Sequence, residues 1–296
     1  MLNLVEALRS PSIGEILPGL RKFAIGELLF AAFTCPGSGE WEASWAEHDR
    51  IMHVLTGSKS LRASDDTWDL QPGDTLFVKK GVNFLRQNTR DDVCLFVFFV
   101  PDQFIRATLH EIAADLPPLP APSEPHETAI RVQHDAGISA FLHAMTVLFG
   151  ASGTPPELLL KLKLKELIAS IVVSPANARL SAYLRCVASR KGPSIPAIME
   201  ANWRHNLPLE AFAKLCNCSL STFKREFRRH YGVAPGRWLH EQRLQCSAHL
   251  LTTTGMSVTQ IVFECGFEQP AHFTRAFKAK FGRPPREYRD ARIAVV

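Results

Sequence analysis

The chain has 296 residues, 46% of them hydrophobic, and a formal net charge of +5. This length predicts two domains, and this hydrophobic content excludes a wholly disordered protein. The sequence lacks both an apolar run of about eighteen residues and an N-terminal export pattern, so we expect a cytoplasmic protein without membrane contact. Its seven cysteines are scattered and odd in number, which argues against a disulfide framework.

The first hundred residues are predicted to form mostly strands, over about residues 22–100. Segments rich in β-formers are separated by turn residues. They are Leu28–Cys35, Ile51–Leu55, Thr75–Lys80 and Cys94–Val100. Short strands at such regular spacing indicate a small sandwich or barrel.

After a proline cluster at residues 116–125, the apolar period becomes helical over about residues 135–187. Ile138–Gly150 and Pro156–Val173 both read as helices. The second carries an apolar stripe made of Leu160, Leu164, Leu167, Ile168 and Ile171. Two interpretations stay open for this stripe: a core face packed against the barrel, or a dimerisation seam.

Basic residues are in excess only in the last third of the chain. Residues 194–296 contain 15 Lys/Arg and 8 Asp/Glu, whereas residues 1–193 contain 19 and 21. This asymmetry indicates a polyanion-binding module attached to another domain. We therefore expect one domain over residues 1–190, a short linker, and a second domain over residues 195–292.

The basic region repeats itself at an interval of fifty residues. Five of the matches are identities and three conserve residue type. The pairs are Phe223/Phe273, Arg225/Arg275, Phe227/Phe277, Gly232/Gly282, Arg228/Lys278, Tyr231/Phe281, Pro235/Pro285 and Trp238/Tyr288. The region therefore contains two copies of one supersecondary unit.

Each copy is predicted to be a helix, a short turn and a second, basic helix. Pro208 suits the first turn of a helix, and Ser219 is a plausible N-cap for the next one. In the second copy, Ser257 and Gln260 form a capping box, and Gln269–Phe281 is the following helix. Helix-turn-helix units place such a second helix in the major groove of DNA.

A helix over Pro235–Thr254 is predicted to connect the two copies. A helix of about 18 residues spans about 27 Å, which suits two second helices in successive major grooves about 34 Å apart.

Helical periodicity places the aromatic residues of the two basic helices inward and a polar set outward. The outward residues are Ser221, Lys224, Arg225, Arg228, Ala271, Thr274, Arg275 and Lys278. Arginine suits guanine edges, Lys, Ser and Thr suit phosphates or single base edges, and Ala271 suits a thymine methyl group. Either helix alone would be read as a solvated face. The repeated arginines at Arg225 and Arg275 favour DNA binding.

The segments SLSTFKREFRRHYGVAPGRWLHEQRLQCSAHLL and SVTQIVFECGFEQPAHFTRAFKAKFGRPPREYR resemble the double helix-turn-helix domain of AraC/XylS-type bacterial transcription regulators, over Ile195–Arg292. The resemblance implies promoter binding and activation through RNA polymerase. It implies DNA contact at Ser221, Lys224, Arg225, Ala271, His272 and Arg275, and our candidate DNA-binding set adds Thr222 and Gln269. Pro270 departs from the usual pattern, because it removes a backbone N–H that could hold a phosphate.

The segment LQPGDTLFVKKGVNF is similar to the cupin-like regulatory domain of the same family. A metal-binding cupin would have histidine where Val82 or Asn83 stands, and only His48 and His53 lie near Glu47. We therefore expect no metal, no cofactor and no catalytic residue. The segment LKLKELIASIVVSPAN resembles the ExsA-like subgroup, which implies control by a partner protein in some members.

The sequence as a whole predicts an α+β protein with two domains. The N-terminal domain would be a cupin-like β-barrel with a helical dimerisation or regulatory segment, and the C-terminal domain an all-α double helix-turn-helix domain. Its expected function is transcription regulation, mostly activation, as a homodimer that responds to a small-molecule effector or an inhibitor protein. Two alternatives are a cupin-type enzyme with a basic DNA-binding appendage and an architectural DNA-binding protein without sequence preference.

Overall fold

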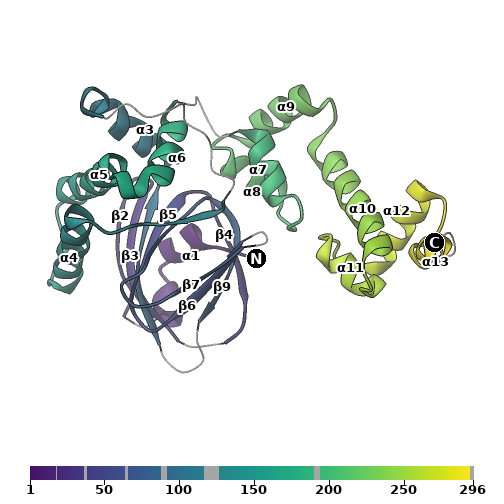
Figure 1. Cartoon of the computed structure of the whole chain (residues 1–296), viewed down its shortest axis with the longest axis horizontal. Helices are drawn as coiled ribbons and strands as arrows, with labels where there is room; N and C mark the ends of the chain where they lie inside the picture. The colour runs from purple at the N-terminus through teal and green to yellow at the C-terminus, as the bar shows by residue number, and fades with distance from the viewer. Residues whose placement is uncertain are drawn as a thin grey trace. The chain divides into compact units, whose positions relative to one another are not determined.

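The computed structural model describes residues 1–17, 19–36, 39–63, 66–87, 92–116, 127–189 and 194–293. The chain divides into two compact units, Met1–Pro193 and Ser194–Val296 (Figure 1). The first unit combines strands with helices, and the second is helical throughout its described residues. The α+β class predicted from the sequence is confirmed. Within the described part of the chain, no helix is long and apolar enough to span a membrane.

The N-terminal unit contains two β-sheets. The six-stranded sheet has the order β11 (Ala129–Arg131), β8 (Thr75–Val78), β5 (Asp49–Thr56), β10 (Val93–Val100), β3 (Leu28–Cys35) and β2 (Arg21–Ile25). The five-stranded sheet has the order β1 (Leu2–Asn3), β4 (Glu42–Ala46), β9 (Gly81–Gln87), β6 (Lys59–Ala63) and β7 (Asp66–Leu70). All pairs are antiparallel except β1 with β4.

The chain passes from one sheet to the other at Gly57, between β5 and β6. Gly57 has a φ of 73°, and a Cβ atom there would lie 2.6 Å from the carbonyl oxygen of Asp92. Only glycine fits this close approach without movement of the backbone. Because β5 and β6 pair in different sheets, the described strands form two facing sheets, and the cupin-like barrel expected from the sequence is not closed.

The six-stranded sheet separates two hydrophobic cores. Along β5, Met52 and Val54 face the five-stranded sheet, whereas Ile51 faces the opposite side. The helices α1 (Leu4–Arg9) and α2 (Ile13–Ile16) complete the core between the sheets. Figure 1 shows α1 lying between the sheets.

Helices cover the other face of the six-stranded sheet (Figure 1). They are α3 (Asp102–Glu111), α4 (Ala136–Gly150), α5 (Glu157–Val173) and α6 (Ala178–Ser189), with 3₁₀ turns η1 (Ala113–Asp115) and η2 (Pro175–Asn177) between them. The five stripe residues of α5 are each at most 1% exposed. The core interpretation of this stripe is therefore confirmed, and its interpretation as a dimerisation seam is wrong.

The C-terminal unit contains seven helices among its described residues. They are α7 (Ile195–Asn202), α8 (Leu209–Leu215), α9 (Leu220–Tyr231), α10 (Pro235–Thr253), α11 (Val258–Glu264), α12 (Pro270–Phe281) and α13 (Pro285–Ile293). The boundaries predicted for the connecting helix and for the second helix of the second copy hold to within a residue, and α9 begins directly after the predicted N-cap Ser219. The second half of the unit has its own core, which includes Ile261, Val262, Phe273 and Phe277.

Candidate nucleic-acid interface

Two helix-turn-helix units make up most of the C-terminal unit. The first consists of α8 and α9 with a turn over residues 216–219, and the second of α11 and α12 with a turn over residues 265–269. The first turn therefore has four residues and the second five. The repeat of fifty residues holds for the second helices, whereas the first helices align at an interval of 49.

The two units repeat in their packing as well as in their sequence. Behind α9, the ring of Phe227 lies 4.5 Å from that of Tyr231 and 5.8 Å from that of Trp238. Behind α12, the ring of Phe277 lies 4.5 Å from that of Phe281 and 5.3 Å from that of Tyr288. In both cases the first pair lies within one helix and the second pair joins it to the next helix. Equivalent aromatic contacts therefore fix the two second helices on the domain.

The helix ends agree with the capping predictions. The Ser219 side chain accepts a hydrogen bond from the backbone N–H of Thr222 at 3.2 Å. The capping box is present, since the N–H of Gln260 donates to Ser257 and the N–H of Ser257 donates to the Gln260 side chain. Gly232 ends α9 in the left-handed conformation, and Gly282 ends α12 in the same way. Both second helices thus end at a left-handed glycine, and α9 also begins at a side-chain cap.

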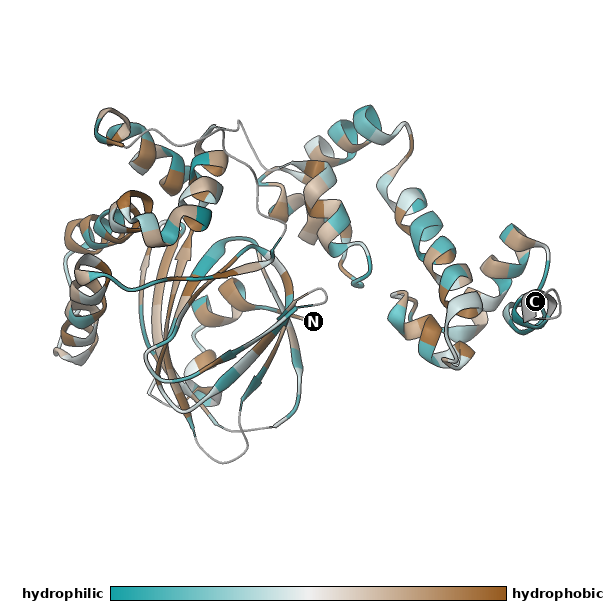
Figure 2. Ribbon diagram, viewed as in Figure 1, coloured by the Kyte–Doolittle hydropathy of each residue, from teal (hydrophilic) through white to brown (hydrophobic). Residues whose placement is uncertain are grey.

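The candidate residues lie on the outward faces of α9 and α12, except Gln269, which is the N-cap of α12. Thr222 and Thr274 are half-buried. The exposed ones are Ser221, Lys224, Arg225, Arg228, Gln269, Ala271, His272, Arg275 and Lys278. Figure 2 shows that α9 is hydrophilic along most of its visible surface. The aromatic residues predicted to point inward, Phe223 and Phe273, are fully buried.

On α9, one carboxylate lies close to two of the arginines. Glu226 Oε1 is 3.2 Å from Arg225 Nε, and Glu226 Oε2 is 3.3 Å from Arg229 Nη1. The side chains of Arg225 and Arg229 are 71% and 76% exposed. Ion pairs this exposed contribute about 0–1 kcal/mol, so a phosphate or a base can replace Glu226 as the partner of Arg225.

On α12, the basic side chains have fewer protein partners. Within the described residues, no carboxylate lies within 4.0 Å of the charged groups of Arg275 or Lys278. Thr274 donates its hydroxyl proton to the carbonyl oxygen of Pro270 at 2.9 Å, which leaves the Thr274 oxygen as an acceptor. The rings of His272 and His240 are 6.1 Å apart.

Several other basic residues hold the C-terminal unit together, a role that the sequence did not indicate. Arg243 on α10 donates from Nε to the carbonyl oxygen of Trp203 and from Nη2 to that of His205. Arg289 donates to the carbonyl oxygens of Leu251 and Met256. Lys280 pairs with Glu241. Only part of the positive charge is therefore free to meet a polyanion.

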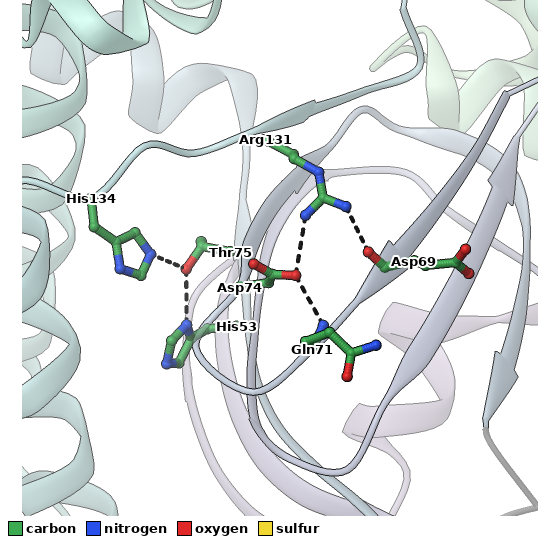
Figure 3. Close-up of polar contacts among 7 residues, drawn as sticks. All are labelled: His53, Asp69, Gln71, Asp74, Thr75, Arg131 and His134. Carbon is green, nitrogen blue, oxygen red and sulfur yellow. Dashed lines mark hydrogen bonds and ion pairs between the residues drawn. The ribbon is translucent and has the colours of Figure 1, made fainter.

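His53, one of the two histidines near Glu47 in the sequence, lies beside a hydroxyl group (Figure 3). Nδ1 of His53 lies 2.8 Å from Oγ1 of Thr75, and Nε2 of His134 lies 2.6 Å from the same oxygen. Burial, followed by the charge of His134, lowers the pKa of His53 to about 4, so its ring is neutral at pH 7. Among the described residues, no group of three His, Cys, Asp or Glu could hold a metal ion.

Beside this pair, Arg131 of β11 ties the β7–β8 turn to the edge of the sheet (Figure 3). Arg131 Nη1 lies 3.2 Å from Asp74 Oδ2, and Arg131 Nη2 donates to the carbonyl oxygen of Asp69. Asp74 Oδ2 also accepts from the backbone N–H of Gln71. These contacts have a structural role.

Comparison with known proteins matches both units. Residues 212–291 match the family model of a helix-turn-helix domain, and residues 49–183 match that of the ExsA N-terminal regulatory domain. The virulence regulon transcriptional activator VirF of Yersinia enterocolitica is 26% identical over 247 residues, which are 83% of this chain and 91% of VirF. The transcriptional regulator ExsA of Pseudomonas aeruginosa is 26% identical over 83% of this chain and 87% of ExsA.

A solved structure of ToxT from Vibrio cholerae aligns with 91% of this chain and 98% of its own, at 13% identity and a TM-score of 0.45. The two domain matches, joined in one chain, define a transcription regulator with a helix-turn-helix module behind a regulatory domain. The chain is similar to transcription regulators of the AraC family, and its residues 49–183 match the N-terminal regulatory domain of ExsA.

Proposed function

We propose that this protein binds promoter DNA sequence-specifically through α9 and α12 and activates transcription. The observation that carries the proposal is the equivalent position of Arg225 and Arg275. Each is exposed on the second helix of its unit, two residues after a buried phenylalanine, and each is backed by the same aromatic contacts. Solvation alone gives no reason for an arginine to recur at that one position.

Arg225 and Arg275 are proposed to read base edges, because a guanidinium group can donate two hydrogen bonds to a guanine. Lys224, Arg228 and Lys278 are proposed to contact phosphates. Ala271 is proposed to touch a thymine methyl group. The remaining candidates, proposed to contribute single polar contacts, are Ser221, Thr222, Gln269, His272 and Thr274. Because Pro270 lacks an N–H group, the start of α12 offers one phosphate donor fewer than a usual helix start.

The two second helices are proposed to enter successive major grooves on one face of the duplex. The connecting helix α10 has 19 residues. At about 1.5 Å per residue it spans about 28 Å, which with the width of the units suits a groove repeat of about 34 Å.

VirF supports the activator assignment, since it is described as a transcriptional activator, and ExsA supports a role as a transcriptional regulator. We further propose contact with RNA polymerase, a homodimer, and control of DNA binding by a small molecule or an inhibitor protein at the N-terminal unit. The functional boundaries proposed for the regulatory and DNA-binding domains are residues 1–190 and 195–292. The family consists of transcription regulators, and no catalytic residue is proposed.

Selection of bound duplexes from a random DNA pool tests the DNA-binding proposal. The full chain should enrich two short boxes about one helical turn apart, and its affinity should fall steeply with salt. Arg225→Ala should relax the sequence preference in one box only, and Arg275→Ala that in the other. The mutant Lys224→Ala should weaken all sequences alike. Equal loss on every sequence with the two arginine variants would contradict base reading.

A further inference from the structure

The core between the two sheets of the N-terminal unit contains a fully buried arginine. Arg50 shares a face of β5 with Met52 and Val54, and its partners across the sheet are Phe99 and Val78. It is 0% exposed, and none of its three guanidinium nitrogens has a hydrogen-bond partner among the described residues. Burial lowers the pKa of Arg50 to about 10, so the group is still charged at pH 7.

The nearest carboxylate does not neutralise Arg50 directly. Asp49 points to the opposite face of the sheet, where it accepts hydrogen bonds from the backbone N–H of Lys80 and the hydroxyl of Tyr183, each at 2.8 Å. No carboxylate among the described residues lies within ion-pair distance of Arg50. A buried charge without a partner is costly, and native proteins satisfy such groups with water, an ion or a ligand.

A second cation lies on the inner side of the facing sheet. Lys59 starts β6 and is 4% exposed, and its Nζ lies 3.9 Å from Sγ of Cys35. Directly across the ladder from Lys59 is Gln87 of β9, which is 6% exposed and whose Oε1 has no partner among the described residues. The charge of Arg50 lies close enough to contribute to the lowered pKa of Lys59, whose main cause is burial. The two positive charges therefore repel each other across the core between the sheets.

A pocket of about 400 Å³ opens to the surface beside Lys59 and Gln87, and Arg50 does not line it. Its lining includes the buried residues Lys59 and Gln87 and the more exposed Ser58, Ser60, Gln71 and Arg86. Asp69 also lines it and accepts a hydrogen bond from the hydroxyl of Ser60. The volume is within the range of small-molecule sites.

We propose that this pocket binds a small polar ligand through an oxyanion group, with Lys59 and Gln87 as direct contacts and Arg50 as a more distant positive charge. The shared chemistry is a carboxylate or a phosphate, because both accept hydrogen bonds from ammonium and amide donors. The proposal deepens the regulatory role proposed for the N-terminal unit. Binding is measured without DNA, so failure of the anion site and failure of the DNA-binding proposal are distinguishable.

Isothermal titration calorimetry of the full chain tests the proposal, with inorganic phosphate and succinate as probes at an ionic strength held constant with chloride. One equivalent of at least one probe should bind, and a preference for either identifies the group. Lys59→Met should weaken that binding at least tenfold. Arg62→Met is the matched control, since Arg62 is on the same strand but stacks on Trp41 outside the sheet. It should bind as the wild type does.

Two further variants keep the test decisive. Phosphate could also bind the basic helices, so Arg225→Ala should retain the pocket's share of the binding. If Lys59→Met does not fold, Gln87→Leu preserves the charge and should still weaken binding.

In chloride alone, Lys59→Met should raise the Tm, because it removes a buried charge. The probe should raise the Tm of the wild type and leave that of Lys59→Met unchanged. A ligand at ten times its Kd raises the Tm by about 3 °C for a unit of this size.

The pH dependence gives a further readout. Burial lowers the pKa of Lys59; the groups that face it are Cys35 and Glu42, which raise the pKa, and Arg50, which lowers it. A bound anion favours the protonated amine, so affinity for succinate should fall as the pH rises, and Lys59→Met should show no such fall. The proposal is overturned if neither probe binds beyond chloride, or if Lys59→Met and Gln87→Leu bind as the wild type does.

Discussion

The two helix-turn-helix units share one packing scheme behind their second helices and differ in the turn before them. The first turn reaches a left-handed conformation at Asn217, with a φ of 51°, and the second at Gly266, with a φ of 77°. Asn217 is exposed, whereas Gly266 is buried. A Cβ atom on Gly266 would lie 2.7 Å from the carbonyl oxygen of Arg204. The second turn is therefore a packing site inside the unit, and the first is a surface turn.

The units differ in charge as well. Arg225 has a carboxylate beside it at Glu226, and the equivalent position after Arg275 is Ala276. The first unit must exchange an ion pair for a DNA contact, and the second has no such pair to break. Because the packing is equal, equivalent substitutions of buried aromatic residues should change the stability of the two units alike. Because the charges differ, equivalent substitutions of the two arginines should change DNA binding by different amounts.

The largest effect is expected from the aromatic residues that the units share. Phe223→Ala and Phe273→Ala each remove a fully buried ring and should each cost about 3–5 kcal/mol of unfolding free energy. Urea denaturation followed by circular dichroism measures the loss. Phe263→Ala is the control, since this phenylalanine is 58% exposed on α11 and its removal should change stability by less than about 0.5 kcal/mol. A large loss at only one of the two buried sites would contradict a shared packing scheme.

The next largest effect should distinguish the two kinds of glycine. Gly232 and Gly266 both have positive φ, so alanine costs about 1 kcal/mol at either position. At Gly232 a Cβ atom meets nothing within 4 Å, whereas at Gly266 it would strike the backbone of Arg204. Gly266→Ala should therefore cost about 2–4 kcal/mol in total, measured by the same denaturation. Equal costs for the two variants would show that the second turn can move away from residue 204.

In DNA binding, the second unit should respond more strongly than the first. Arg275→Ala and Arg225→Ala are each expected to cost about 1–3 kcal/mol at one base pair, with the larger loss at Arg275, because Arg225 must first leave Glu226. Fluorescence anisotropy with a selected duplex measures both. Glu226→Gln should tighten binding by up to about 1 kcal/mol in the wild type and leave the Arg225→Ala variant unchanged. An equal gain in both backgrounds would mean that Glu226 acts only through the overall charge.

The sequence predicted the features that depend on local pattern. The repeat, the caps at Ser219 and Ser257, and the strand Leu28–Cys35 were all evident from residue type and spacing. The placement of the α5 stripe against the sheet was one of two open interpretations, because an apolar stripe looks the same whether its partner is its own core or a second chain. Contacts between distant segments decide that question.

What the sequence did not predict depends on such distant contacts. The pairing of β5 and β6 in separate sheets, the fixing of Arg243 to residues 203–205, and the burial of Arg50 have no local signature. Side chains of a strand point alternately to its two faces, so the sequence of β5 also allowed Arg50 to be exposed. The second turn is one residue longer than the first, so the first helices repeat at 49 residues whereas the second helices repeat at 50. A comparison of the aromatic residues alone does not detect this difference.

The smallest effect concerns the starts of the two second helices. Ser219 caps α9 through its side chain, whereas Gln269 makes no side-chain cap for α12, and Pro270 follows it. Ser219→Ala should therefore cost about 1 kcal/mol of stability, and Gln269→Ala only a few tenths. If Gln269 instead contacts DNA, Gln269→Ala should weaken duplex binding without loss of stability. Denaturation and anisotropy on the same two variants separate the roles, and a stability loss at Gln269 as large as that at Ser219 would remove the distinction between the two helix starts.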